Sequence, residues 1–177
     1  MTMVDGKICN AATGTKSTSK CYICAATSKH FNKLDYKGEV NVTALVVGIS
    51  VLHAKIRLFK FILHLTYKLK VKKYRGIKSK EEKDLEDQTK REIQTRLRTE
   101  TGLLIDMPKS NFGNRNDGNT SRRFFENPTL AAELTGISYK LTYRLKAILE
   151  AISSGFEIDP VNYERYASET ARLYVKL

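Results

Sequence analysis

The stretch LHAKIRLFKFILHLTYKLKVKKYR, from Leu52 to Arg75, decides the fold of this chain. Its apolar side chains recur every three or four residues in two neighbouring rows, a pattern typical of an amphipathic helix with a wide buried face. The first row is Leu52, Ile56, Phe59, Leu63, Tyr67 and Val71, and the second is Leu58, Ile62, Leu65 and Leu69. We therefore expect a central helix that packs into the core on more than one side.

A row of basic side chains follows the other side of the same predicted helix. Its members are Arg57, Lys60, His64, Lys68, Lys72 and Arg75. At 100° per residue this row lies opposite the centre of the apolar face, and the sequence has no Asp or Glu between Lys55 and Lys80. Two interpretations remain open: a surface that contacts a polyanion, and a face of solvated lysines and arginines.

The overall composition favours an anionic partner. The 177 residues fit one domain of ordinary size, and 31 basic against 19 acidic residues give a net charge of +12. Such an excess favours a nucleic acid or an anionic membrane surface. However, no secretory signal is visible at the N-terminus, and the most apolar stretch, Val42 to Leu52, is too short to cross a bilayer. We therefore expect a soluble, intracellular protein with no membrane partner.

The sequence Cys21-Tyr-Ile-Cys24 is the clearest metal signal in the chain. Two thiolates at this spacing can supply half of a tetrahedral zinc shell, while a buried structural pair and a chance spacing are the alternatives. An odd total of three cysteines argues against a disulfide framework. We expect the pair to lie in a short β-hairpin over residues 1–26.

The rest of the chain, residues 27–177, is predicted to be helical and to form one compact unit with the hairpin, so the fold class is mainly α. Ser79 and Glu82 match the capping-box pattern at the start of one helix, and Gly102 ends that helix. Asp159 and Pro160 begin the last helix.

The search for catalytic residues is negative. The chain contains no nucleophile elbow, phosphate-binding loop or zinc-protease motif. Asp5, Asp106, Asp117 and Asp159 are scattered in turns or at helix caps, where Asp is expected for backbone reasons. We predict no catalytic residue in this chain.

A turn from Asn116 leads into a helix N-terminus that carries Arg122 and Arg123. The backbone N–H groups of the helix and the two guanidinium groups are suited to hold a DNA phosphate. The alternative is a loop with a surface arginine pair.

Four stretches of the chain together resemble the Transib transposases and, more distantly, the related vertebrate V(D)J recombination-activating recombinase. They occur in the order of the family and span nearly the whole chain. The stretches are MVDGKICNA with CYICAATSKHFN, LHAKIRLFKFILHLTYKL, NDGNTSRRFFENP, and SGFEIDPVNYERYASETARLYVKL.

This resemblance implies a nuclear DNA recombinase with an RNase H-like core, which cuts and joins DNA with three acidic residues and divalent metal. The matching part is the mostly helical, zinc-bearing region inserted late in that core, and Cys21 and Cys24 match the zinc cysteines of the family. The two zinc histidines and the third catalytic acid are then expected beyond Leu177, and the first two acids before Met1. Ala25 stands where relatives often carry Gly.

We therefore expect a truncated or domesticated transposase that binds DNA and is inactive as an enzyme on its own. It would hold zinc only as a half site and would not bind the divalent metal of the parent enzyme. The predicted DNA-binding residues are Arg57, Lys60, Lys68, Lys72, Arg75, Arg122 and Arg123. The alternative is a protein-interaction module that pairs with a full-length transposase or with itself, and a third reading is an active nuclease that uses carboxylates of this chain.

Overall fold

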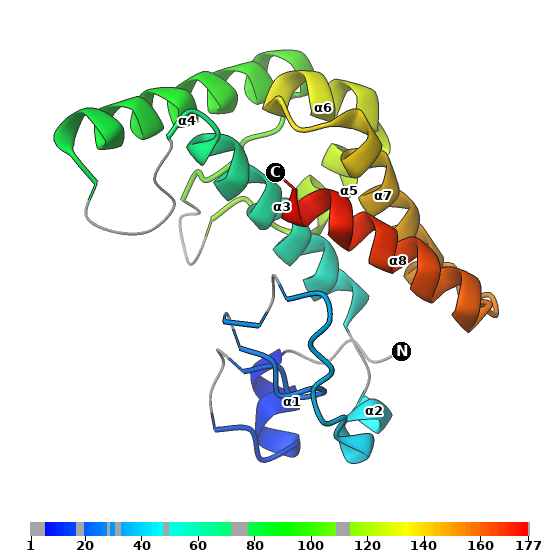
Figure 1. The fold of residues 1–177 in the computed structure, drawn as a ribbon. Coiled ribbons are helices and arrows are strands. Elements are labelled where there is room, and N and C mark those ends of the chain that lie inside the picture. Colours follow the sequence, from blue (N-terminus) through cyan, green and yellow to red (C-terminus); the bar gives the residue numbers. More distant parts are fainter. Residues whose placement is uncertain are drawn as a thin grey trace. The chain divides into compact units, whose positions relative to one another are not determined.

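The computed structural model describes residues 6–16, 20–27, 29–30, 33–47, 50–71, 78–108 and 114–176, and it is mainly helical, as predicted (Figure 1). Its helices are α1 (Gly6–Ala12), α2 (Val42–Val47), α3 (Val51–Lys68), α4 (Lys80–Thr101), α5 (Gly118–Glu126), α6 (Pro128–Thr135), α7 (Tyr139–Ser153) and α8 (Pro160–Val175). The chain divides into two units. One comprises Met1–Ala54 with Ala147–Leu177, and the other, which we call the central unit, is Lys55–Lys146.

Helix α3 has the wide buried face that its two apolar rows predict. Its buried residues are Phe59, Ile62, Leu63, Leu65, Thr66 and Tyr67. The prediction is wrong for Leu52 and Leu69, which are more than two-fifths exposed, whereas Val71 beyond them is buried. Burial of each large apolar side chain in such a core contributes about 1.5 to 3 kcal/mol, so the central residues of the helix fix its orientation.

The core of the central unit is built from one or two apolar side chains of each helix around α3. The ring centroids of Phe59 on α3 and Phe124 on α5 lie 4.9 Å apart at an interplanar angle of 52°, an arrangement that aromatic pairs favour. Leu97 of α4, Leu134 of α6 and Leu141 of α7 are also buried. The helices of this unit therefore share one hydrophobic core.

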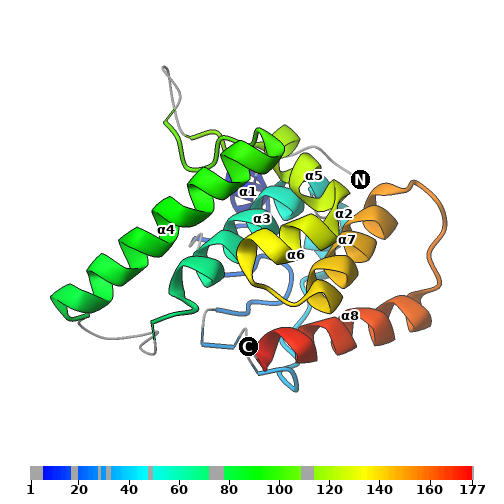
Figure 2. The same ribbon diagram turned by 90° about the horizontal axis from the view of Figure 1, so that it is seen from above.

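Helix α4 begins and ends where the sequence predicts. The Ser79 hydroxyl accepts a hydrogen bond from the Glu82 N–H at 3.2 Å, and the Ser79 N–H donates to the Glu82 carboxylate at 2.8 Å. Gly102 ends the helix with a φ of 67°, a left-handed conformation that glycine adopts without strain. The buried residues of α4 are Thr89, Ile93 and Leu97, none of them in its first two turns, and its N-terminal end extends beyond the rest of the central unit (Figure 2).

A polar cluster fastens the loop between α4 and α5 to helix α3. The Tyr67 hydroxyl donates to the Asp106 carboxylate at 2.8 Å, and the Asn116 side-chain amide donates to the same carboxylate at 2.5 Å. In return, the Asp106 N–H donates to the Asn116 side-chain oxygen at 2.8 Å. The ammonium group of Lys90 on α4 lies 3.8 Å from the carboxylate. Asp106 itself has a φ of 52°, a left-handed conformation that Asp adopts more readily than most residues.

The other unit differs from the predicted hairpin in its first arm. Gly6–Ala12 forms helix α1 and not a strand, and the Cys9 side chain is buried. An antiparallel bridge between Lys20 and Thr27 joins the two sides of the cysteine turn, and among the described residues no bridge joins this turn to Gly6–Ala12. A segment of seven residues carries too little periodicity to separate a strand from a helix. The predicted boundary at residue 26 falls inside this unit.

The last helix begins at the predicted cap. The Asp159 carboxylate accepts hydrogen bonds from the N–H groups of Val161 at 2.9 Å and Asn162 at 3.2 Å, and Pro160 occupies the first turn of α8. The backbone hydrogen bond from Asn162, followed by that from Val161, holds the pKa of Asp159 below its usual value.

We expect the Tyr67 hydroxyl to make the central unit sensitive to alkaline pH. Burial, and then the hydrogen bond to Asp106, raise the pKa of Tyr67 well above its ordinary value of 10. The unfolded chain therefore loses this proton first, so the contribution of Tyr67 is complete below about pH 10 and declines as the pH rises further. Tyr67→Phe should lower the free energy of unfolding at neutral pH by about 1 to 3 kcal/mol, since the Asp106 carboxylate loses one of its hydrogen-bond donors and keeps only Asn116 and the more distant Lys90.

Chemical denaturation followed by circular dichroism at pH 7 and above pH 10 measures both effects. Tyr143→Phe is the matched control, because Tyr143 is exposed and its change should stay within about 0.5 kcal/mol. Equal stabilities of Tyr67→Phe and Tyr143→Phe at both pH values would contradict this account of the polar cluster.

Candidate functional site

The exposed side of helix α3 carries the predicted basic row, which we call the basic face: Arg57, Lys60, His64 and Lys68. Arg57 and His64 are exposed, whereas Lys60 and Lys68 are partly exposed. None of the three cations Arg57, Lys60 and Lys68 forms an ion pair or a hydrogen bond with another described residue. At 1.5 Å per residue the basic face extends about 16 Å along the helix, which matches several phosphates of a duplex backbone.

Two predicted members of the basic row, Lys72 and Arg75, lie outside the described residues. Lys70, just past the end of α3, is the first lysine of this region with a carboxylate partner. Its ammonium group lies 3.2 Å from the Glu92 carboxylate of α4, and this contact holds the pKa of Glu92 below its usual value. Lys70 therefore does not belong to the basic face, whose lysines and arginine have no carboxylate partner among the described residues.

The structure gives the two arginines of α5 partners within the protein. The Arg122 guanidinium donates to the Glu126 carboxylate at 3.0 Å and to the Asn119 side chain at 3.0 Å. The Arg123 guanidinium donates to the Thr101 carbonyl at 2.8 Å, a carbonyl that the end of α4 leaves without a helical partner. The N-terminus of α5 is capped by the Asp117 carboxylate. A phosphate at the predicted site would have to displace these groups. The i,i+4 spacing of Arg122 and Glu126 and the cap residue Asp117 are local signals, whereas the Arg123 contact with Thr101 has none.

Cys21 and Cys24 lie in a tight turn. The Cys21 N–H donates to the Ala26 carbonyl at 2.8 Å, and the Ala25 N–H donates back to the Cys21 carbonyl at 2.9 Å. Ala25 has a φ of 58°, a left-handed conformation that costs a residue with a Cβ about 1 to 2 kcal/mol. Glycine would avoid this cost, which gives a physical reason for the glycine expected at this position from the resemblance.

The two thiols are close enough to influence each other. Burial raises the pKa of the Cys24 thiol, and the neighbouring Cys21 thiol adds to this effect, while a backbone hydrogen bond from Ala26 opposes it. Two thiolates provide two of the four ligands of a structural zinc site. Within the part of the chain that the structure describes, no group of three or more His, Cys, Asp or Glu side chains is placed to hold a metal ion.

The histidines are engaged in local contacts. His30 accepts a hydrogen bond from the Thr27 N–H at 3.1 Å and stacks on the Tyr36 ring, with centroids 4.2 Å apart. The His53 ring nitrogen and the Ser50 hydroxyl are 2.9 Å apart, so this histidine closes the first turn of α3 rather than lying fully in the core. The cysteine pair therefore gains no third ligand from His30 or His53.

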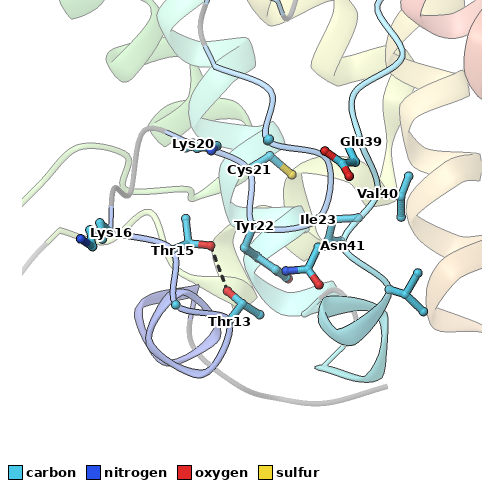
Figure 3. Close-up of a pocket in the computed structure, with 13 residues that line it drawn as sticks. Thr13, Thr15, Lys16, Lys20, Cys21, Tyr22, Ile23, Glu39, Val40 and Asn41 are labelled. Atoms are coloured by element: carbon cyan, nitrogen blue, oxygen red, sulfur yellow. Dashed lines mark hydrogen bonds between the residues drawn. The ribbon is translucent and has the colours of Figure 1, made fainter.

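A pocket of about 730 Å³ lies beside the cysteine turn and was not predicted (Figure 3). Its wall is formed by segments that are separated in the sequence, so no local pattern indicates it. Lys16, Lys20, Cys21 and Glu39 line the pocket, and the Thr13 and Thr15 hydroxyls in its wall are 3.0 Å apart (Figure 3). Cations and a carboxylate thus occur together, and the pocket has no single charge preference.

The described residues thus define a mainly helical protein with a basic helix face and a separate cysteine turn. The chain matches no known family model, and a comparison with curated proteins found no match. No helix in the described part of the chain has the length and apolar character that crossing a bilayer requires.

We expect Gly38 to be essential for the shape of the cysteine turn. A Cβ at this position would clash with the Cys24 carbonyl oxygen and lie 3.1 Å from the Tyr36 ring. Gly38→Ala should therefore open the turn and expose the Cys24 thiol, whose pKa then falls. The rate of Cys24 modification should rise severalfold, because the thiolate is the reactive form and exposure of the thiol increases its fraction.

The rate for each cysteine can be measured by mass spectrometry after timed labelling at neutral pH. Lys37→Ala changes an exposed neighbour and should leave all three rates unchanged, and buried Cys9 should stay slow in both variants. An unchanged Cys24 rate in Gly38→Ala would show that the close approach does not shape the turn.

Proposed function

We propose that this chain binds duplex DNA through the basic face of α3, and that it derives from a Transib-type transposase. The observation that carries the proposal is the division of α3 into two faces. Phe59, Ile62 and Leu63 are buried, while Arg57, Lys60 and Lys68 point away from that core without a partner among the described residues.

The chemistry of the basic face favours phosphates over bases. Helix α3 contains no Asn or Gln, the side chains that read adenine by paired hydrogen bonds. Lysine and arginine contacts to the backbone position a protein on DNA but carry no sequence information. The proposed binding is therefore strongly dependent on salt and only weakly dependent on sequence.

The proposal covers binding without cleavage. Zinc at Cys21 and Cys24 and a nuclear location are parts of the same proposal. The cysteine turn supplies two zinc ligands, so further ligands would have to come from outside the described residues.

Replacing the three unpaired cations tests the basic face. The triple variant Arg57→Gln, Lys60→Gln, Lys68→Gln should bind a duplex oligonucleotide more weakly than the wild type at every salt concentration. Each lost phosphate contact should reduce the slope of log K against log salt by about 0.9. Fluorescence anisotropy across a salt series measures both the affinity and the slope.

A charge-matched control is available on α8. Arg165→Gln, Arg172→Gln, Lys176→Gln removes the same charge from exposed positions and should leave the slope unchanged. A role for the basic face would be contradicted if the α3 variant and the wild type had equal slopes of log K against log salt. It would also be contradicted if the α8 control lost as much slope as the α3 variant.

A protein-interaction function is the second candidate, and exposed apolar side chains in the α7–α8 connection and at the start of α8 favour it. Phe156 is 82% exposed and Val161 is 74% exposed, and exposed apolar side chains that form one patch mark interaction sites. Light scattering separates this candidate from the first. A chain that self-associates, and becomes monomeric on Phe156→Ser, supports the second function.

A further inference from the structure

Two tyrosines one turn apart on α7 form an exposed aromatic pair. Tyr139 is 51% exposed and Tyr143 is 49% exposed, and their ring centroids lie 5.8 Å apart at an interplanar angle of 36°. The neighbouring residues Leu141 and Thr142 are buried. Because α7 directs those two side chains into the core, packing does not require aromatic rings on its other side.

The charge around this aromatic pair is positive. Helix α7 contains no Asp or Glu before Glu150. Lys140, between the two tyrosines, is exposed. The ammonium group of Lys146, one turn beyond Tyr143, donates to the Glu126 carbonyl at 3.1 Å. The carboxylate of Glu126 is paired with Arg122, so its charge is already compensated.

Exposed rings among cations are the features by which proteins bind single-stranded nucleic acid. An unpaired base offers its flat face for stacking on an aromatic ring, and basic side chains hold the phosphates that flank it. A base inside a duplex cannot stack in this way, because both of its faces are covered by neighbouring base pairs. The aromatic pair therefore distinguishes single strands from the duplex that suits the basic face of α3.

We propose that the Tyr139–Tyr143 surface binds single-stranded nucleic acid, with a base stacked on the tyrosine rings and an adjacent phosphate near Lys140. This surface is separate from the basic face of α3 and does not rest on the proposed duplex binding. The ligand is recognised by stacking and charge, so little sequence preference is expected.

The test measures binding of the full chain to fluorescein-labelled oligothymidylate of about 16 nucleotides, long enough for one such site, and to a duplex of equal length. The variant Tyr139→Leu, Tyr143→Leu removes the rings and keeps good helix formers. It should weaken oligothymidylate binding roughly tenfold or more, as expected for one or two lost stacking contacts, and leave duplex binding unchanged. Tyr139→Phe, Tyr143→Phe keeps the rings and should bind as the wild type does.

Phe156→Leu is the matched control for the loss of an exposed ring elsewhere, and it should bind both probes like the wild type. The proposal is overturned if the wild type does not bind oligothymidylate or if the leucine variant binds it as tightly as the wild type does. It is also overturned if the phenylalanine variant loses as much affinity for oligothymidylate as the leucine variant. Equal loss of single-strand and duplex binding also overturns it, as does a change of oligomeric state that shows the tyrosines to be a contact between copies. Failure of the α3 variant to lose duplex affinity, by contrast, rejects only the proposed function.

Discussion

Helix α3 can bury only one of its faces, and the rest of the central unit depends on which face that is. Turning the helix by half a turn would expose Phe59, Ile62 and Leu63, each of which contributes about 1.5 to 3 kcal/mol through burial. It would also bury Arg57 and Lys60, and each unpaired charge costs several kcal/mol to remove from water. Both effects act in the same direction. The position of the basic face is therefore a consequence of the core and needs no separate cause.

The elements that could be predicted are those whose signals lie within one or two turns of the chain. The apolar rows of α3, the Ser79 and Glu82 box of α4 and the Asp159 cap of α8 are all local patterns, and the structure confirms them. Helix α1 was predicted as a strand because seven residues give no clear period. Its Cys9 side chain is buried, which is a tertiary contact that a local pattern does not contain.

The candidate site was less predictable, because its polar contacts join residues far apart in the sequence. Asp106 has the left-handed backbone of a turn residue, as its residue type suggests, but its carboxylate binds Tyr67, which is 39 residues away. Arg123 was expected to meet phosphate and instead closes the end of α4 at Thr101, 22 residues away. The charge of a side chain can be read from a sequence, whereas its partner is determined only by the fold.

The most direct test of the central claim is lysine footprinting of the chain with and without duplex DNA, by brief acetylation and mass spectrometry. If the face of α3 opposite Phe59 meets the phosphate backbone, Lys60 and Lys68 are modified in the free chain and protected in the complex. Exposed Lys33 and Lys176 should react equally in both. Protection confined to other lysines, with Lys60 and Lys68 reacting alike in the free and bound chain, would contradict the account.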